Sequence, residues 1–83
     1  METPKIKEVK PLADLKLMVV FENGVVKSFD VHPYLKDFPI FQELLDDRLF
    51  KKVKVDCGGF GIAWNDEIDL SRYDIWERGT TCQ

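Results

Sequence analysis

The chain has 83 residues and a formal net charge of −3; 45% of its residues are hydrophobic and 33% are charged. This length leaves room for one hydrophobic core, so we expect a single domain over residues 1–83, and the hydrophobic content excludes a disordered chain. The acidic balance disfavours nucleic acid as a partner of this domain alone, because phosphate contacts need a basic surface. A cluster of basic residues is expected to form a solvated edge: Arg48, Lys51, Lys52 and Lys54.

Two further features concern the location of the protein. No apolar run approaches the ~20 residues of a membrane-spanning helix, and residues 1–10 lack the apolar stretch of a secretory signal. We therefore expect no membrane contact and a cytoplasmic location. Cys57 and Cys82 lack CxxC spacing and are predicted to be free thiols, which suits a reducing compartment.

The first part of the chain predicts three strands. Residues 6–10 read as a short strand ended by Pro11, and residues 15–21 alternate in the manner of a half-buried strand. The apolar face of this second strand comprises Leu15, Leu17, Val19 and Phe21. Asn23-Gly24 favours positive φ at both central positions of a type I′ turn, so residues 25–30 should return as the second arm of a hairpin.

The centre of the chain predicts short helices. Pro33 suits the first turn of a helix over residues 33–36. Residues 38–45 follow as a second helix, because apolar residues recur there at helical spacing. Its predicted apolar stripe comprises Phe38, Phe41, Leu44 and Leu45. Asp47 is expected to cap a further turn over residues 48–50 through its carboxylate.

The last part predicts a second hairpin and a closing helix. Residues 53–55 and 60–64 should pair around a turn at residues 57–59, with a brief extended piece at residues 68–70 after another turn. In the second arm, one face should hold Phe60, Ile62 and Trp64. The helix should begin at an N-cap, Ser71, and dock through Tyr73 and Trp76. It should end at Gly79 and leave residues 80–83 as a frayed tail.

The predicted order of elements is therefore β-β-β-α-β-β-α. Strands joined by hairpins favour antiparallel pairing. The predicted fold class is α+β, with a small antiparallel sheet and a helix packed on one face.

Several stretches of the chain resemble a known family. They are Pro4-Lys5-Ile6-Lys7-Glu8-Val9, the run from Leu15 to Gly24, Phe29-Asp30-Val31, Phe41-x-x-Leu44, Leu49-Phe50-x-x-Val53-x-Val55-Asp56 and Gly61-x-x-Trp64-Asn65-x-x-Ile68-Asp69-Leu70. Through them the chain, over about residues 4–76, resembles the bacterial family called "domain of unknown function 2442". The pattern departs from the family at Ser71-Arg72, where members often have Cys-Pro.

The resemblance implies an α+β domain with an antiparallel sheet, and it implies no catalytic residue. Some members of the family carry a helix-turn-helix domain after this one, and some are encoded beside a small toxin-like protein. Both features imply a regulatory or antitoxin-like role.

One pair of residues could carry acid–base chemistry. Asp30 lies two residues before His32, the single histidine, so both would share a strand face and the carboxylate could orient a general base. With Asp69, this pair defines an alternative function, a small ligand-binding or hydrolytic domain. No Ser or Cys nucleophile stands in a recognisable motif, so we predict no catalytic site and no enzyme.

Two other patterns are interpreted as turns. The acidic residues Asp66, Glu67 and Asp69 depart from the spacing of a Ca²⁺ loop, so neither a metal site nor a cofactor is predicted. The stretch Gly58-Gly59-Phe60-Gly61 leads into a strand, whereas a phosphate cradle leads into a helix; a hairpin turn is therefore expected.

The aromatic content carries the leading functional prediction. Six Phe, two Trp and two Tyr are many for a small core, so those left outside should mark an association surface; Phe60, Trp64 and Trp76 are the partner-binding candidates. We expect a non-enzymatic protein-interaction or regulatory module whose partner is a small toxin-like protein. The other alternative is a structural homodimer paired through an exposed edge strand.

Overall fold

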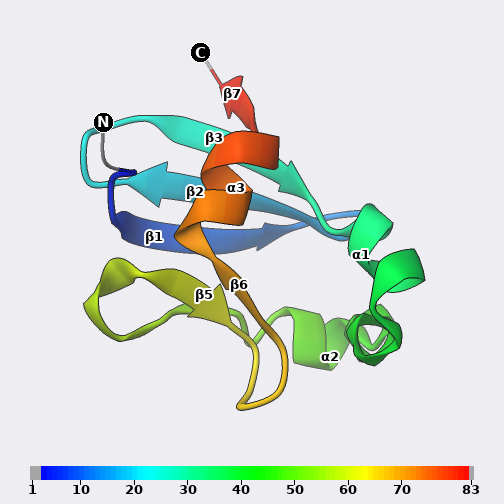
Figure 1. Cartoon of the computed structure of the whole chain (residues 1–83). Coiled ribbons are helices and arrows are strands. Elements are labelled where there is room, and N and C mark those ends of the chain that lie inside the picture. The colour runs from blue at the N-terminus through cyan, green and yellow to red at the C-terminus, as the bar shows by residue number, and fades with distance from the viewer. Residues whose placement is uncertain (1–2, 83) are drawn as a thin grey trace.

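A computed structural model of the protein describes residues 3–82, which form two antiparallel sheets connected by short helices (Figure 1). The larger sheet has the strand order β1-β2-β3-β7, with β1 Ile6–Leu12, β2 Lys16–Phe21, β3 Val26–Asp30 and β7 Thr80–Cys82. The smaller sheet has the order β4-β5-β6, with β4 Lys54–Val55, β5 Gly61–Ala63 and β6 Asp69–Ser71. The predicted α+β class with antiparallel pairing is confirmed, and the strands are divided between two sheets instead of one.

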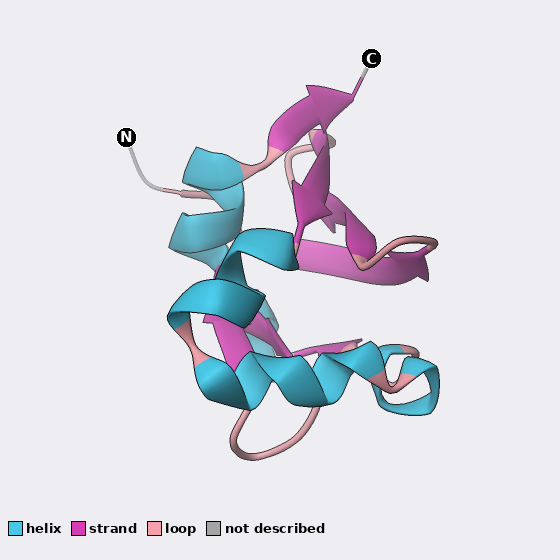
Figure 2. Cartoon of the chain, turned by 90° about the vertical axis from the view of Figure 1, so that its right-hand side faces the viewer, coloured by secondary structure: helices cyan, strands magenta, loops and turns pink. Residues whose placement is uncertain are grey.

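The helices lie along the side and front of these sheets. Three follow one another between β3 and β4, as Figures 1 and 2 show: α1 His32–Asp37, the 3₁₀ helix η1 Pro39–Leu45 and α2 Asp47–Phe50. A short 3₁₀ turn, η2 Cys57–Gly59, joins β4 to β5, and α3 Arg72–Arg78 contacts both β3 and β6. Among residues 3–82, no helix is long and apolar enough to cross a membrane.

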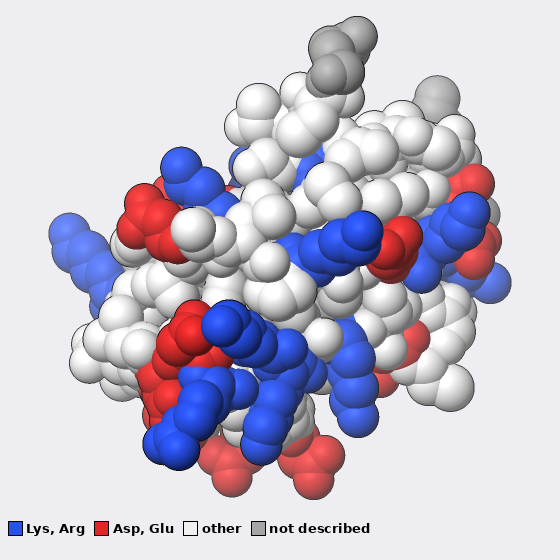
Figure 3. Space-filling model, turned by 180° about the vertical axis from the view of Figure 1, so that it is seen from behind, with Lys and Arg blue, Asp and Glu red and all other residues white. Residues whose placement is uncertain are grey.

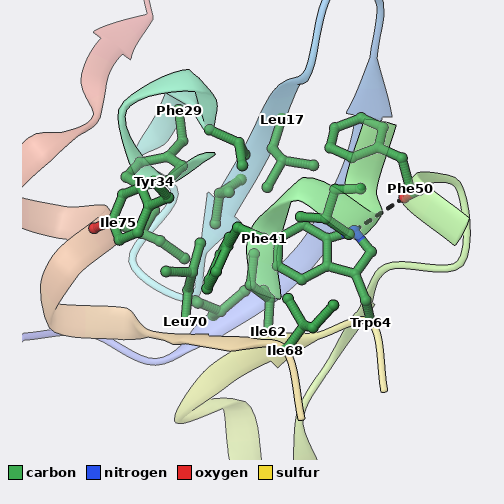
Figure 4. Packing of buried hydrophobic residues seen from close by; sticks show 14 of the residues in the cluster. Leu17, Phe29, Tyr34, Phe41, Phe50, Ile62, Trp64, Ile68, Leu70 and Ile75 are labelled. Atoms are coloured by element: carbon green, nitrogen blue, oxygen red, sulfur yellow. Dashed lines mark hydrogen bonds between the residues drawn. The ribbon is translucent and has the colours of Figure 1, made fainter. Parts of the chain in front are cut away.

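The core lies where the two sheets and the central helices meet (Figure 4). The larger sheet contributes Leu17, Val19 and Phe21 from β2 and Phe29 from β3. The predicted apolar face of β2 is therefore confirmed at these three positions. The smaller sheet and its turn contribute Ile62, Trp64, Ile68 and Leu70, while the helices contribute Tyr34, Phe41, Leu44, Phe50 and Ile75. Buried apolar surface from every layer therefore converges on one cluster, which is the main source of stability in so small a chain.

The hairpin between β2 and β3 forms as predicted, but its turn type was predicted wrongly. Gly24 has φ of 91°, whereas Asn23 is not among the residues with positive φ. The Gly24 N–H donates to the carbonyl of Phe21, and the Phe21 N–H donates to the carbonyl of Val25. This is a three-residue loop with glycine in the left-handed position, and the Asn23 side chain accepts a hydrogen bond from the Val25 N–H at 3.0 Å.

The first hairpin differs from the prediction at both of its arms. Strand β1 continues through Pro11 to Leu12, because β1 is an edge strand and the missing N–H of proline can face away from β2. Leu15 was predicted to begin the next strand, but it lies in the turn with φ of 56°, next to Asp14 with φ of 62°.

The C-terminal residues form a strand, so the predicted frayed tail is wrong for residues 80–82, and Gln83 lies outside the described residues. Strand β7 pairs with β3 in the register Val26↔Cys82, Lys27↔Thr81 and Ser28↔Thr80. Gly79 ends α3 as predicted and packs so closely that a Cβ there would lie 2.6 Å from the carbonyl oxygen of Ile75. The chain can then reach the edge of β3, where backbone groups would otherwise lack partners.

The central helix is a 3₁₀ helix that begins at Pro39, and only part of the predicted stripe is buried. Phe41 and Leu44 are buried three residues apart, while Phe38 and Leu45 are exposed to 50% and 64%. At three residues per turn, Leu45 lies about 120° around the helix from Leu44. Phe38 precedes the helix with extended backbone, as a residue before proline prefers, and its ring contacts Phe41 while remaining half exposed.

Two caps can be compared with their predictions. Asp46, one residue before the predicted Asp47, caps α2 and accepts a hydrogen bond from the Arg48 N–H at 3.0 Å. The Ser71 cap is confirmed, since its hydroxyl accepts from the Asp74 N–H at 3.2 Å. The docking of α3 was only partly predicted, because Tyr73 is exposed and Ile75 is fully buried in its place, with Trp76 against Phe21.

Substitutions on α3 test this docking. Ile75→Ala should lower the free energy of unfolding by about 2–5 kcal/mol, because it removes fully buried methyl groups and leaves a cavity. Tyr73→Ala, the matched change on the exposed face, should cost about 1 kcal/mol or less. Urea denaturation followed by circular dichroism measures both, and equal losses would contradict this packing.

Candidate functional site

The Asp30–His32 pair predicted from the sequence forms, but not on one strand face, because β3 ends at Asp30 and α1 begins at His32. Asp30 Oδ1 accepts a hydrogen bond from the His32 backbone N–H at 3.0 Å and lies 2.6 Å from the ring Nδ1. A second carboxylate, that of Asp14 in the β1–β2 turn, lies 3.6 Å from the other ring nitrogen. Sequence reasoning missed Asp14, because only the pairing of β2 with both neighbours brings that turn beside the end of β3.

The electrostatics of this pair follow from its contacts. Partial burial raises the pKa of Asp30, but hydrogen bonds from the His32 backbone and ring, with the charges of His32 and Lys16, outweigh it. The pKa of Asp30 is therefore lower than its ordinary value of 3.8.

The structure does not join this pair to Asp69. Asp69 begins β6 in the smaller sheet, and among residues 3–82 no hydrogen bond or ion pair connects it with Asp30 or His32. Cys57 and Cys82 are free, as predicted; both are exposed, and neither contacts the histidine through a hydrogen bond. These polar contacts therefore connect His32, at the start of α1, with Asp30 at the end of β3 and with Asp14 in the β1–β2 turn.

Of the acidic residues near β6, Asp66 and Glu67 lie in a polar turn, as predicted, and Asp69 begins the strand. Asn65 Oδ1 accepts hydrogen bonds from the N–H groups of Glu67 and Ile68, both at 2.9 Å. A cavity of about 280 Å³ beside this turn is lined by Lys54, Asp56, Ala63, Asn65, Asp66 and Asp69. Lys54 already places a positive charge among these carboxylates, and no group of three or more His, Cys, Asp or Glu residues within 3–82 could hold a metal ion.

The three aromatic residues predicted to bind a partner occupy different environments. Trp64 is 4% exposed, and its indole N–H donates to the carbonyl of Phe50 at 3.1 Å, so it belongs to the core (Figure 4). Trp76 is partly buried against Phe21, with Lys27 Nζ 4.4 Å from its ring centroid.

Phe60, the third candidate, is 55% exposed. Its backbone is helical (φ −81°, ψ −10°), because it ends η2 instead of beginning the strand. The strand alternation therefore starts at Gly61 and leaves Phe60 off the face of Ile62 and Trp64. Lys5 and Arg72 lie over its ring at 5.3 Å and 5.0 Å from the centroid.

An apolar opening lies elsewhere, between the central helices and the start of α3. We call it the aromatic groove; it has a volume of about 290 Å³ and is lined by Tyr34, Phe38, Ile40, Phe41, Glu67, Asp69, Leu70 and Asp74. Phe38 stacks on Tyr34 with ring centroids 5.8 Å apart and lies 5.9 Å from Phe41. Half of the Phe38 side chain remains exposed at this groove.

The groove has an acidic side and an aromatic side. Its charged lining residues are Glu67, Asp69 and Asp74, and none of the ion pairs within residues 3–82 involves them. The pKa of the Tyr34 hydroxyl is raised, mainly by burial and secondly by the negative charge of Asp74, although Arg78 acts in the opposite direction. The Arg78 guanidinium lies 5.6 Å from the centroid of the Tyr34 ring and donates to its hydroxyl at 3.4 Å.

The sequence contains one signal that could have located this groove. Pro39 keeps Phe38 out of the helix, so Phe38 could have been assigned to a surface before the structure was known. The carboxylates carry no such signal, because β6 and α3 reach the central helices only through tertiary packing.

The basic cluster forms a mixed surface. Lys51 pairs with Asp47 at 2.9 Å, and Arg48 lies 3.6 Å from Asp46. On the face shown in Figure 3, Lys and Arg side chains lie beside Asp and Glu side chains.

Together these observations define a small α+β domain with two antiparallel sheets and an acidic, aromatic groove. A family model described as "Protein of unknown function (DUF2442)" matches residues 6–81, nearly the whole chain. The chain belongs to this family, as its sequence resemblance indicated. No curated protein and no solved structure matches it.

The Asp30–His32 contact predicts an acid-dependent loss of stability. A lowered folded-state pKa contributes stability that is present above the unfolded value and is lost as pH falls through the folded value. The free energy of unfolding should therefore decrease as the pH falls through and below the ordinary value of 3.8, and Asp30→Asn should flatten this decrease. Urea titrations at several pH values measure it; a variant with the wild-type slope would contradict the contact.

Proposed function

We propose that the domain is a non-enzymatic, regulatory protein-interaction module that binds a partner protein in the cytoplasm through the aromatic groove. The observation that carries the proposal is Phe38, a large apolar side chain left half exposed at a cavity with an aromatic wall. Covering the exposed part of such a ring contributes about 2 kcal/mol of binding free energy. Aromatic anchors next to a pocket are typical of the residues that dominate protein–protein interfaces.

The nature of the partner follows from the family resemblance. Because some members of the family are encoded beside a small toxin-like protein, an antitoxin-like role with such a protein as partner is the form of the proposal that we favour. An apolar segment of that protein would insert between Phe38 and Leu70.

The hydrolytic alternative receives less support. The aromatic groove is lined by Asp69, but neither Asp30 nor His32 lines it. Asp30 lies 2.6 Å from Nδ1 of His32, and Asp14 lies 3.6 Å from Nε2, the ring nitrogen that would have to face a substrate.

The homodimer alternative has one specific feature in its favour. Strand β7 is an edge of the larger sheet, and all three of its residues are exposed. Light scattering after size-exclusion chromatography tests it, since a protein that is monomeric at high concentration excludes a dimer through β7.

Substitutions at the groove test the interaction directly. The tagged full-length chain is used to isolate a partner from its native cell, and the purified partner is then titrated calorimetrically against variants. Phe38→Ser should weaken binding about tenfold or more, because the anchor is lost. Leu45→Ser is the matched control: Leu45 is also a large apolar residue and is 64% exposed, but it does not line the groove, so affinity should stay within about twofold.

Two outcomes would redirect the proposal. If Phe38→Ser binds as tightly as the wild type, the groove is not the interface. If Phe60→Ser abolishes binding instead, the interface is the surface that the sequence pattern indicated. Thermal denaturation of each variant separates lost binding from lost folding.

A further inference from the structure

The walls of the aromatic groove differ in chemistry. Tyr34, Phe38, Ile40 and Phe41, from α1 and η1, form the apolar wall. The opposite wall, from the turn before β6 to α3, comprises Glu67, Asp69, Leu70 and Asp74. An inserted apolar side chain would therefore lie with one side against aromatic rings and its flanking residues beside carboxylates.

The size of the groove limits what it can hold. Its volume of about 290 Å³ lies just below the range for pockets that bind small molecules, roughly 300–1,000 Å³. It suits one large side chain of a protein segment better than a cofactor-sized molecule.

The charges of the groove select among such segments. None of the three carboxylates is paired within residues 3–82, and neither Lys nor Arg lines the cavity. A partner that covers these carboxylates without a positive charge removes them from water, which costs desolvation free energy. A lysine or arginine of the partner offsets that free energy.

The aromatic wall adds a second reason for a cation. Arg78 already lies against Tyr34, both over the ring and in a hydrogen bond to the hydroxyl, so this cluster accommodates a guanidinium. The neighbouring Phe38 ring is half exposed and has no such cation within the described residues. A cation from a partner could lie over that ring with additional stabilisation.

We propose that the aromatic groove selects a protein segment in which a large apolar side chain is flanked by lysine or arginine. This inference rests on the proposed function, because it specifies the chemistry of the segment that enters the same groove. The apolar side chain packs between Phe38 and Leu70, and the flanking cations pair with Glu67, Asp69 and Asp74.

Three short peptides provide the test: acetyl-Lys-Phe-Lys-amide, acetyl-Gln-Phe-Gln-amide and acetyl-Glu-Phe-Glu-amide, each titrated into the ¹⁵N-labelled full chain. The lysine peptide should shift the amide resonances of Phe38, Leu70 and Asp74 and bind about fivefold or more tightly than the glutamine peptide. The glutamate peptide should bind most weakly. High salt should reduce the difference, since these groups are partly exposed.

Matched variants assign the preference to the groove. In the triple variant Glu67→Gln, Asp69→Asn and Asp74→Asn, the lysine and glutamine peptides should bind alike. The control Glu8→Gln, Glu22→Gln and Glu43→Gln removes the same number of negative charges outside the groove and should keep the preference. Thermal denaturation confirms that both triple variants are folded.

The outcomes separate this inference from the proposed function. Equal groove shifts with all three peptides would overturn the charge preference and leave the interaction module standing. Absence of groove shifts with every peptide, or shifts confined to residues 47–54, would overturn the inference, and the Phe38 and Leu45 comparison would then decide the proposed function independently. Concentration-dependent groove shifts without peptide would identify a second copy of this chain as the occupant and overturn it as well.

Discussion

The contact on which the rest of the structure depends is the packing of Phe41 between Tyr34 and Trp64. The centroid of the Phe41 ring lies 5.4 Å from that of Tyr34 and 6.2 Å from that of Trp64. One residue of η1 therefore joins α1, which follows the larger sheet, to the residue that follows β5 of the smaller sheet (Figure 4). The Trp64 indole N–H donates to Phe50 and satisfies its polar group within the core. Neither sheet could bury its apolar face alone, because the smaller one has strands of only two or three residues.

This packing also creates the groove. Phe41 and Leu44 occupy the inner side of η1, which fixes the helix against the core and leaves the preceding Phe38 on the outside. The hairpin β5–β6 carries Asp69 and Leu70 to the facing wall, and the Ser71 cap starts α3 so that Asp74 lies beside them. The same constraint that completes the core therefore assembles the acidic and aromatic walls.

The comparison of pattern with structure shows where local reasoning succeeds. The alternation of Leu17, Val19 and Phe21 and the cap at Ser71 were predictable, because each depends on neighbours within one element. The same reasoning failed at Phe60, where a helical backbone at the end of η2 interrupts the alternation. It also failed at the C-terminal strand, because three residues have no strand signal until the edge of β3 is available to pair with them.

The candidate site was predictable only in part, for a related reason. Asp30 and His32 are two residues apart, so their contact follows from local geometry, and the pattern identified it. The groove combines residues from α1 and η1 with residues from β6 and α3, and no local spacing relates these segments. Sequence by itself therefore determined most of the elements, the α+β class and the apolar face of β2, since these arise from alternation, turn residues and caps. Tertiary structure alone decided which aromatic residues stay exposed and which carboxylates face them, because both depend on how two small sheets share one core.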